Sequence, residues 1–119
     1  MSETSAIRRS LASIHGASGV FNPLSVDVVS ETFLATDGCG ADVVFDCAGV
    51  PAGMDNALSA VRIRGNIVII AVWEQPMNID FNRISFKEVI FTGEGIPWSM
   101  SNFVDELFYF CAFDRHSRL

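Results

Sequence analysis

Two continuous apolar runs, with a segment of helical spacing between them, occupy the middle of the chain. Residues 43–45 and 67–73 are rich in β-branched side chains, which is typical of strands buried on both faces, as in parallel sheets. Between the runs, apolar residues recur at helical spacing from Met54, shortly after Pro51, and proline is well tolerated in a first helical turn. The pattern predicts a strand–helix–strand unit with a right-handed crossover.

The same alternation continues along the rest of the chain. We expect helices over residues 5–15, 25–36 and 51–62. We expect strands over residues 19–22, 42–47, 65–73 and 89–93. Residues 77–86 are ambiguous between an extended segment and a short helix, and a last helix is expected from Ser101 or Asn102 to about Ala112. The order predicts an α/β fold, a doubly wound parallel sheet with helices on both faces.

The first predicted helix has an apolar stripe that should face a core. Ile7, Leu11 and Ile14 share one side of it, with Arg8 and Arg9 toward water. The second predicted helix has a similar apolar stripe, formed by Val26, Val29 and Phe33.

Composition narrows the class of partner and the compartment. The chain has 119 residues and a net charge of −6, so one domain is expected, with no nucleic-acid partner and no binding to an anionic membrane. The longest apolar run is far shorter than the ~20 residues that span a bilayer, and the start, MSETSAIRRS, has no apolar signal core. An odd count of three cysteines favours a reducing compartment, and we expect a cytoplasmic protein.

The sequence offers no metal-ligand or catalytic constellation. Cys39, Cys47 and Cys111 are widely spaced, without a C-x-x-C pair, and the two histidines are far apart, so we predict no zinc site and no catalytic residues. Asp46 lies in a predicted buried strand and is interpreted as a hydrogen-bonded core acid, not a catalyst. His15 is expected at the end of a helix.

Five segments, in this order and spacing, resemble a known family: SETSAIRR, the Gly16-Ala17 followed by FNP, DGCGADVVFDCAG, AVRIRGNIVIIAVWEQP and FKEVIFTGE. They resemble the cofactor domain of zinc-dependent medium-chain alcohol and polyol dehydrogenases, and look closest to the 2,3-butanediol dehydrogenase-like branch. The resemblance implies a Rossmann-like domain with strand order 3-2-1-4-5-6 that binds NAD or NADP. We expect residues 1–98 to be a partial NAD(P)-binding domain and residues 99–119 a divergent C-terminal helix and tail.

The chain also departs from that family. Against the family pattern it starts at the tail of the second strand, without the first strand and its glycine-rich turn, so the sheet is expected to be partial. No G-x-G-x-x-G occurs, and Gly38, Gly40 and Gly49 lie on the wrong elements to supply one. Residues 19–22 would then lose their sheet partner, and residues 42–47 would become an exposed edge that invites pairing with other chains.

The resemblance implies a set of cofactor-binding residues. Glu3 corresponds to the acid that hydrogen-bonds the adenosine ribose in NAD-preferring relatives, and Arg8 to a residue lining the adenosine. The remaining candidates follow the fourth, fifth and sixth strands of the family: Cys47, Ala48, Gly49, Ala71, Val72, Trp73, Glu94, Gly95 and Ile96. The alternatives are a helix N-terminal acid for Glu3, a surface arginine for Arg8 and ordinary loop residues for the others.

Three functional hypotheses follow. The first is a fragment of an NAD(P)-dependent alcohol or polyol dehydrogenase, whose ancestral reaction is hydride transfer between a secondary alcohol and NAD, inactive alone. The second is a non-catalytic remnant that docks on intact dehydrogenase subunits, or forms homo- or hetero-oligomers, through exposed strand edges. The third, another nucleotide-binding α/β domain such as a methyltransferase core, needs a glycine-rich loop before an acidic strand end, which the chain does not offer.

Overall fold

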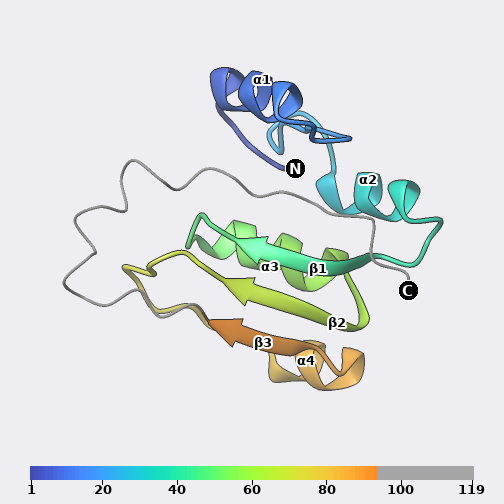
Figure 1. The fold of residues 1–119 in the computed structure, drawn as a ribbon. Helices are drawn as coiled ribbons and strands as arrows, with labels where there is room; N and C mark the ends of the chain where they lie inside the picture. The colour runs from blue at the N-terminus through green and yellow to red at the C-terminus, as the bar shows by residue number, and fades with distance from the viewer. Residues whose placement is uncertain (94–119) are drawn as a thin grey trace.

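The computed structural model describes residues 1–93 of the chain, drawn in colour in Figure 1. Helices and strands alternate through most of this part. The elements are α1 (Ala6–Ile14), α2 (Val28–Ala35), β1 (Ala41–Asp46), α3 (Pro51–Ala60), β2 (Val61–Ile69), α4 (Phe81–Lys87) and β3 (Ile90–Gly93). The last predicted helix, from residue 101, lies outside the described residues.

The strands form a three-stranded parallel sheet in the order β1-β2-β3. Its register places Val43 beside Asn66 and Asn66 beside Ile90. The predicted strand–helix–strand unit is therefore present as β1, α3 and β2, and the fold class, a Rossmann-like α/β sheet, is as expected. Within the described sheet β1 lies at an edge, as the sequence indicated.

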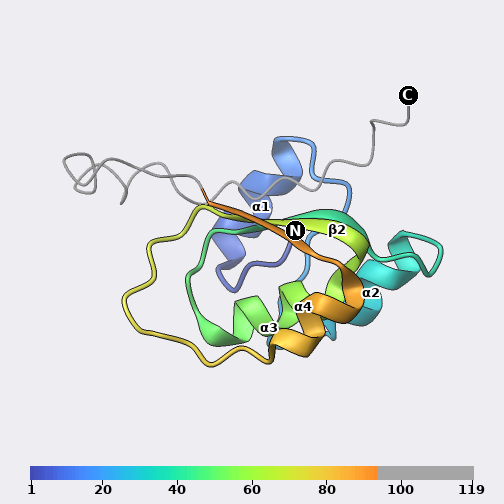
Figure 2. The same cartoon turned by 90° about the horizontal axis from the view of Figure 1, so that it is seen from below.

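The sheet is packed on one face by helices, and this is where the core lies. Figure 2 shows α3 and α4 on one side of the sheet, whereas α1 lies on the opposite side, beyond the β1 edge seen in Figure 1. The buried cluster joins α3 to the sheet through Met54, Leu58, Val61, Ile67 and Val89, exposed by 9% or less. Burial of these apolar side chains supplies the main driving force for this packing.

The boundaries around β2 differ from the prediction. The helix before it ends at Ala60, not Arg62, and the strand runs from Val61 to Ile69 instead of 65–73. A Cβ added at Gly40 would meet the carbonyl oxygen of Ala60 at 2.8 Å, so the turn between α3 and β2 packs directly on the start of β1. At the other end, the N–H groups of Ile70 and Ala71 both donate to the Asp46 carbonyl at 2.9 Å, and the regular ladder stops there.

The N-terminal part differs more. The expected strand at residues 19–22 is reduced to one parallel bridge between Ser2 and Phe21. The N–H of Glu3 donates to the Phe21 carbonyl at 3.0 Å, and the Phe21 N–H donates to the Met1 carbonyl at 2.8 Å. The prediction that this segment has no partner is therefore wrong, because the first three residues pair with it.

Two helices in this part correct the prediction further. The stripe of α1 is exposed, with Ile7 at 76% and Ile14 at 77%, because no described element covers it. The second helix begins at Val28 because the Asp27 side chain accepts hydrogen bonds from the N–H groups of Val29 and Ser30 and so forms its N-cap.

The ambiguous segment ends in helix α4. Asp80 caps its start by accepting from the Asn82 N–H at 2.9 Å, and Glu88 closes it in a left-handed conformation with φ 52°. Among residues 1–93, no helix has the length and apolar character needed to cross a membrane.

Candidate cofactor site at the strand ends

The loops that follow β1 and β2 meet around the carboxylate of Asp46. This side chain sits at the end of β1 and the residue is 5% exposed. Its Oδ1 accepts from the N–H groups of Ala48 and Gly49, each at 3.2 Å, and its Oδ2 accepts from the Trp73 indole N–H at 2.9 Å. We call this contact between the two loops the Asp46 junction. It confirms Asp46 as a hydrogen-bonded core acid.

Close backbone approach reinforces the Asp46 junction. Gly49 has φ +61°, and a Cβ there would lie 3.0 Å from the Val72 carbonyl oxygen and 3.1 Å from the Ala71 Cβ. A left-handed conformation and a close neighbour both favour glycine at this position. The small residue expected at Ala71 therefore lies close to the first loop, and its backbone role in cofactor binding stays a prediction.

The structure thus brings together most of the residues predicted near the nicotinamide half. Ala48, Gly49, Ala71 and Trp73 share the Asp46 junction, and Cys47 and Val72 adjoin them in the same loops. The N–H groups of Ala48, Gly49 and Ala71 already donate to Asp46. A bound cofactor would therefore meet these loops through other backbone groups, while Asp46 holds the loops in place.

Glu3 and Arg8 form a separate cluster at the start of α1. The Arg8 Nε lies 2.9 Å from the Glu3 Oε2, and the Glu3 side chain is 9% exposed. The same carboxylate accepts from the Ser5 N–H at 2.7 Å. Burial acts to raise the pKa of Glu3, but the hydrogen bonds from Arg8 and Ser5 and the charge of Arg8 outweigh it, and the pKa is lowered.

The structure does not join these two groups of candidates. The Glu3 side chain accepts hydrogen bonds from Ser5 and Arg8 at the start of α1, whereas the Asp46 side chain accepts from the loops that follow β1 and β2. Gly38 and Gly40 precede β1, at the end of the strand opposite to Asp46, which confirms that they cannot form a phosphate-binding turn beside it. Glu94, Gly95 and Ile96 lie outside the described residues.

The link between Trp73 and Asp46 was missed by the sequence reasoning. An indole N–H and a buried acid are natural partners, but 26 residues separate them in the chain. The only available signal was that each follows an apolar strand of one parallel sheet, whose carboxyl ends share an edge.

In the described part of the chain, no three His, Cys, Asp or Glu side chains are grouped so as to hold a metal ion. Cys39 is exposed, and His15 takes the C-cap position of α1. The helix-end position expected for His15 is confirmed.

Comparison with known proteins places this arrangement in a family. A family model described as "Zinc-binding dehydrogenase" matches residues 1–105. An L-threonine 3-dehydrogenase from Pyrococcus furiosus is 38% identical over 94 residues, which cover 78% of this chain and 27% of the relative. An (R,R)-butanediol dehydrogenase from Neisseria gonorrhoeae is 32% identical over 90 residues, which cover 75% of this chain and 25% of the relative. The chain spans about a quarter of the length of these curated relatives.

Solved structures agree with the sequence relatives. The 2R,3R-butanediol dehydrogenase of Bacillus subtilis has a TM-score of 0.70 and 28% identity, covering 91% of this chain and 32% of that protein. A Sinorhizobium meliloti protein described as a zinc-binding dehydrogenase and bound to NADP has the same TM-score and identity. The match covers 87% of this chain and 32% of that protein. The family match, the relatives and the parallel sheet agree, and the chain belongs to the zinc-binding dehydrogenase family.

Proposed function

We propose that this chain is part of the cofactor domain of an NAD(P)-dependent alcohol or polyol dehydrogenase, of the butanediol type, and that it supplies the strand-end loops facing the nicotinamide half. The observation that carries the proposal is the Asp46 junction. One buried carboxylate ties together the loops at the carboxyl ends of two parallel strands, which is where sheets of this kind bind nucleotides.

The residues fit the cofactor only in part. The strand-end loops are fixed by Asp46 and closely packed at Gly49, as a surface that receives a planar ring requires. The sequence has no G-x-G-x-x-G, so this chain lacks the usual cradle for a pyrophosphate. When bound, NAD(P) supplies the hydride acceptor or donor, and the role of this chain's residues is to hold the two loops in one arrangement.

Binding tests this site directly. Val72 is 56% exposed beside the Asp46 junction, whereas Ile63 is 63% exposed near the start of β2, at the other end of the strand. Saturation-transfer NMR of the 119-residue chain with NAD⁺ should show weak binding, with a Kd of about 1 mM or weaker, because the chain has no glycine-rich turn to bind the phosphates. Val72→Glu should abolish the nicotinamide signal, and Ile63→Glu should preserve it.

Two outcomes contradict different parts of this proposal. Equal signals in the two variants would remove the site from the strand ends. Micromolar, saturable binding that Val72→Glu abolishes would keep the site and overturn the inference that the phosphate cradle is missing.

The chain alone is proposed to be inactive. The ancestral reaction, hydride transfer between a secondary alcohol and NAD, needs groups that orient and deprotonate the alcohol, and the sequence provides no such constellation. Purified chain incubated with zinc, NAD⁺ and 2,3-butanediol or L-threonine should produce no NADH. Zinc-dependent NADH formation would refute this part of the proposal.

NAD is proposed over NADP because Glu3 carries the negative charge expected to repel a 2′-phosphate. The Glu3–Arg8 pair at 2.9 Å partly neutralises that charge, so the preference should be modest. Glu3→Gln should bring NADP⁺ binding closer to NAD⁺ binding in the same NMR assay, and an unchanged ratio would assign Glu3 to the helix start alone.

A second candidate function is docking on another dehydrogenase chain. It is favoured by the position of β1 at an edge of the described sheet, where Val43 and Phe45 are 37% and 39% exposed. Exposed apolar edge strands pair with other chains. Co-purification with an intact butanediol dehydrogenase, or self-association in solution, should be lost in Val43→Lys and kept in Ile63→Lys; equal association of both variants would argue against the β1 edge.

A further inference from the structure

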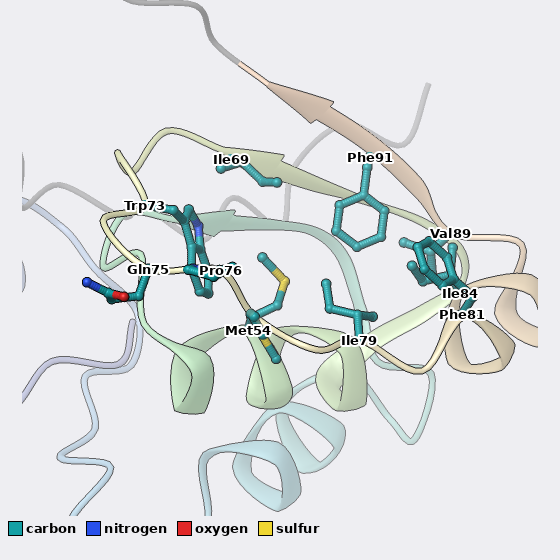
Figure 3. A pocket seen from close by; sticks show the side chains of 11 residues that line it. Met54, Ile69, Trp73, Gln75, Pro76, Ile79, Phe81, Ile84, Val89 and Phe91 are labelled. Atoms are coloured by element: carbon teal, nitrogen blue, oxygen red, sulfur yellow. The ribbon is translucent and has the colours of Figure 1, made fainter.

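A pocket lies under the loop between β2 and α4. It is a pocket of about 570 Å³ between the helix-packed face of the sheet and residues 73–79 of this loop. Figure 3 shows side chains from the strands, from α3 and from the loop converging on it. Small-molecule pockets in proteins typically measure about 300–1,000 Å³ and are mostly apolar, so this volume suits one small molecule.

The deep walls of the pocket are apolar. Ile69 and Phe91 come from β2 and β3, and in Figure 3 the Phe91 ring points into the space. Met54 of α3 and Ile84 of α4 close the other sides, and Met54 is only 2% exposed. Unbranched, polarizable methionine side chains adapt to ligands of different shape, so this wall can accommodate an apolar body.

The side chains of the rim offer almost no hydrogen bonding. Trp73 borders the pocket, but its indole N–H donates to Asp46 at 2.9 Å, which fixes the ring and occupies its donor. Apart from Trp73, Gln75 is the one polar side chain among the described lining residues, and in Figure 3 its amide points away from the other labelled side chains. Pro76, Met77 and Ile79 complete the rim.

None of the lining side chains among residues 1–93 carries a charge. Transfer of an ionised group into such surroundings without a partner is strongly unfavourable. A dinucleotide, with its two phosphates, is therefore a poor fit here, and an uncharged apolar molecule is a good one.

We propose that this pocket binds an uncharged, apolar small molecule, such as a medium-chain alcohol or ketone or a two-ring aromatic compound. The ligand inserts its apolar body between Met54, Phe91 and Ile84, under the rim formed by Ile79 and Trp73. Trp73 borders both sites, but the proposed cofactor site uses the backbone of the strand-end loops, whereas this pocket uses the apolar side chains beneath the second loop.

The test uses the full 119-residue chain and the uncharged dye N-phenyl-1-naphthylamine. Dye fluorescence should rise and saturate at one molecule per chain. 1-Decanol should displace the dye, decanoate should compete about tenfold more weakly or worse because its carboxylate is buried unpaired, and NAD⁺ should not compete.

Two matched substitutions locate the dye. Ile79→Asp places a charge at the rim, whereas Ile63→Asp places one on an exposed part of β2 that does not line the pocket. Dye affinity should fall about tenfold or more in Ile79→Asp and remain unchanged in Ile63→Asp. Circular dichroism checks that both variants are folded, and Phe81→Asp, at a lining residue that is 75% exposed, replaces Ile79→Asp if that variant unfolds.

Equal affinities of the pocket variant and Ile63→Asp would overturn the proposal, as would non-saturating dye uptake. Displacement by NAD⁺ would also overturn it, because the dye would then report the strand-end site. Failure of the proposed cofactor site leaves a different signature, since it changes the NAD⁺ NMR signals and leaves decanol displacement intact.

Discussion

Residues 41–93 and residues 1–36 contain similar apolar patterns, but the apolar stripe of α3 in the first part is buried and that of α1 in the second is exposed. In the first part, Met54 and Leu58 have helical spacing and are 2% and 1% exposed. In the second part, Ile7 and Ile14 have the same kind of spacing and are 76% and 77% exposed. Periodicity therefore identifies which residues share a helix face, while burial depends on whether another element packs against that face.

Different interactions consequently hold the two parts. Residues 41–93 contain the buried cluster of α3, β2 and the residue before β3. The N-terminal part depends more on polar contacts, including the Glu3–Arg8 pair, the Asp27 cap and the bridge between Ser2 and Phe21. Because individual polar contacts at a surface contribute little, we expect the N-terminal part to unfold at lower denaturant concentration than the core around α3.

Removal of a core side chain should give the largest effect and show this difference directly. Leu58→Ala should lower the free energy of unfolding by about 2–5 kcal/mol, since it removes buried methyl groups and leaves a cavity. Ile14→Ala, at a 77% exposed position, should change it by about 0.5 kcal/mol or less. Urea unfolding followed by circular dichroism measures both, and a large loss in Ile14→Ala would mean that α1 is covered in solution.

The Asp46 junction gives the next largest effect. Gly49→Ala should lower the free energy of unfolding by about 2–3 kcal/mol, because alanine is strained at this positive φ and its methyl group would press on Val72 and Ala71. Gly38→Ala is the matched control: φ is +81° and nothing lies within 4 Å of the added Cβ, so only about 1 kcal/mol of backbone strain remains. Equal losses would show that the two loops do not pack closely.

The same contrast between local pattern and long-range contact explains which parts of the fold could be predicted from the sequence. Continuous apolar runs predicted β1 and the C-terminal half of β2, and the position of Asp46 in an apolar strand predicted a buried, hydrogen-bonded acid. The end of β2 was placed too late because residues 70–73 are as apolar as the strand itself. There the shared Asp46 carbonyl, a long-range contact, ends the ladder.

The candidate site could be predicted only as two loops at one sheet edge. The 2.9 Å contact between Trp73 and Asp46 depends on the path of the second loop. The pocket beneath that loop depends on how far α4 lies from α3. Neither distance is encoded in a local pattern. The alternation of elements, in contrast, predicts a parallel sheet, and the family resemblance implies the order of its strands.

Helix α3 is also held at its C-terminal end, by a contact from α4. The Lys87 Nζ donates to the carbonyl groups of Leu58, Ser59 and Val61 at 2.8–2.9 Å. Lys87→Met keeps the apolar stem but leaves these acceptors to water, so the free energy of unfolding should fall by about 1 kcal/mol. Arg64→Met removes only an exposed ion pair with Glu88 and should lower the free energy of unfolding by less, about 0–0.5 kcal/mol. A larger loss in Arg64→Met than in Lys87→Met would show that the Lys87 contact does not stabilise the end of α3.

The smallest expected effect concerns Glu3, which tests the polar contacts of the N-terminal part. Its pKa is lowered in the folded chain from the ordinary value of 4.5, so the ionised carboxylate stabilises the fold above pH 4.5, and this contribution is lost as the pH falls through the lower folded value. Glu3→Gln should therefore be less stable than the natural chain by about 0.5–1 kcal/mol at neutral pH, and the gap should close in acid. Urea unfolding at several pH values measures it. A gap independent of pH would show that Glu3 acts through packing, and no gap at all would mean that its pair with Arg8 is as weak as an ordinary surface ion pair.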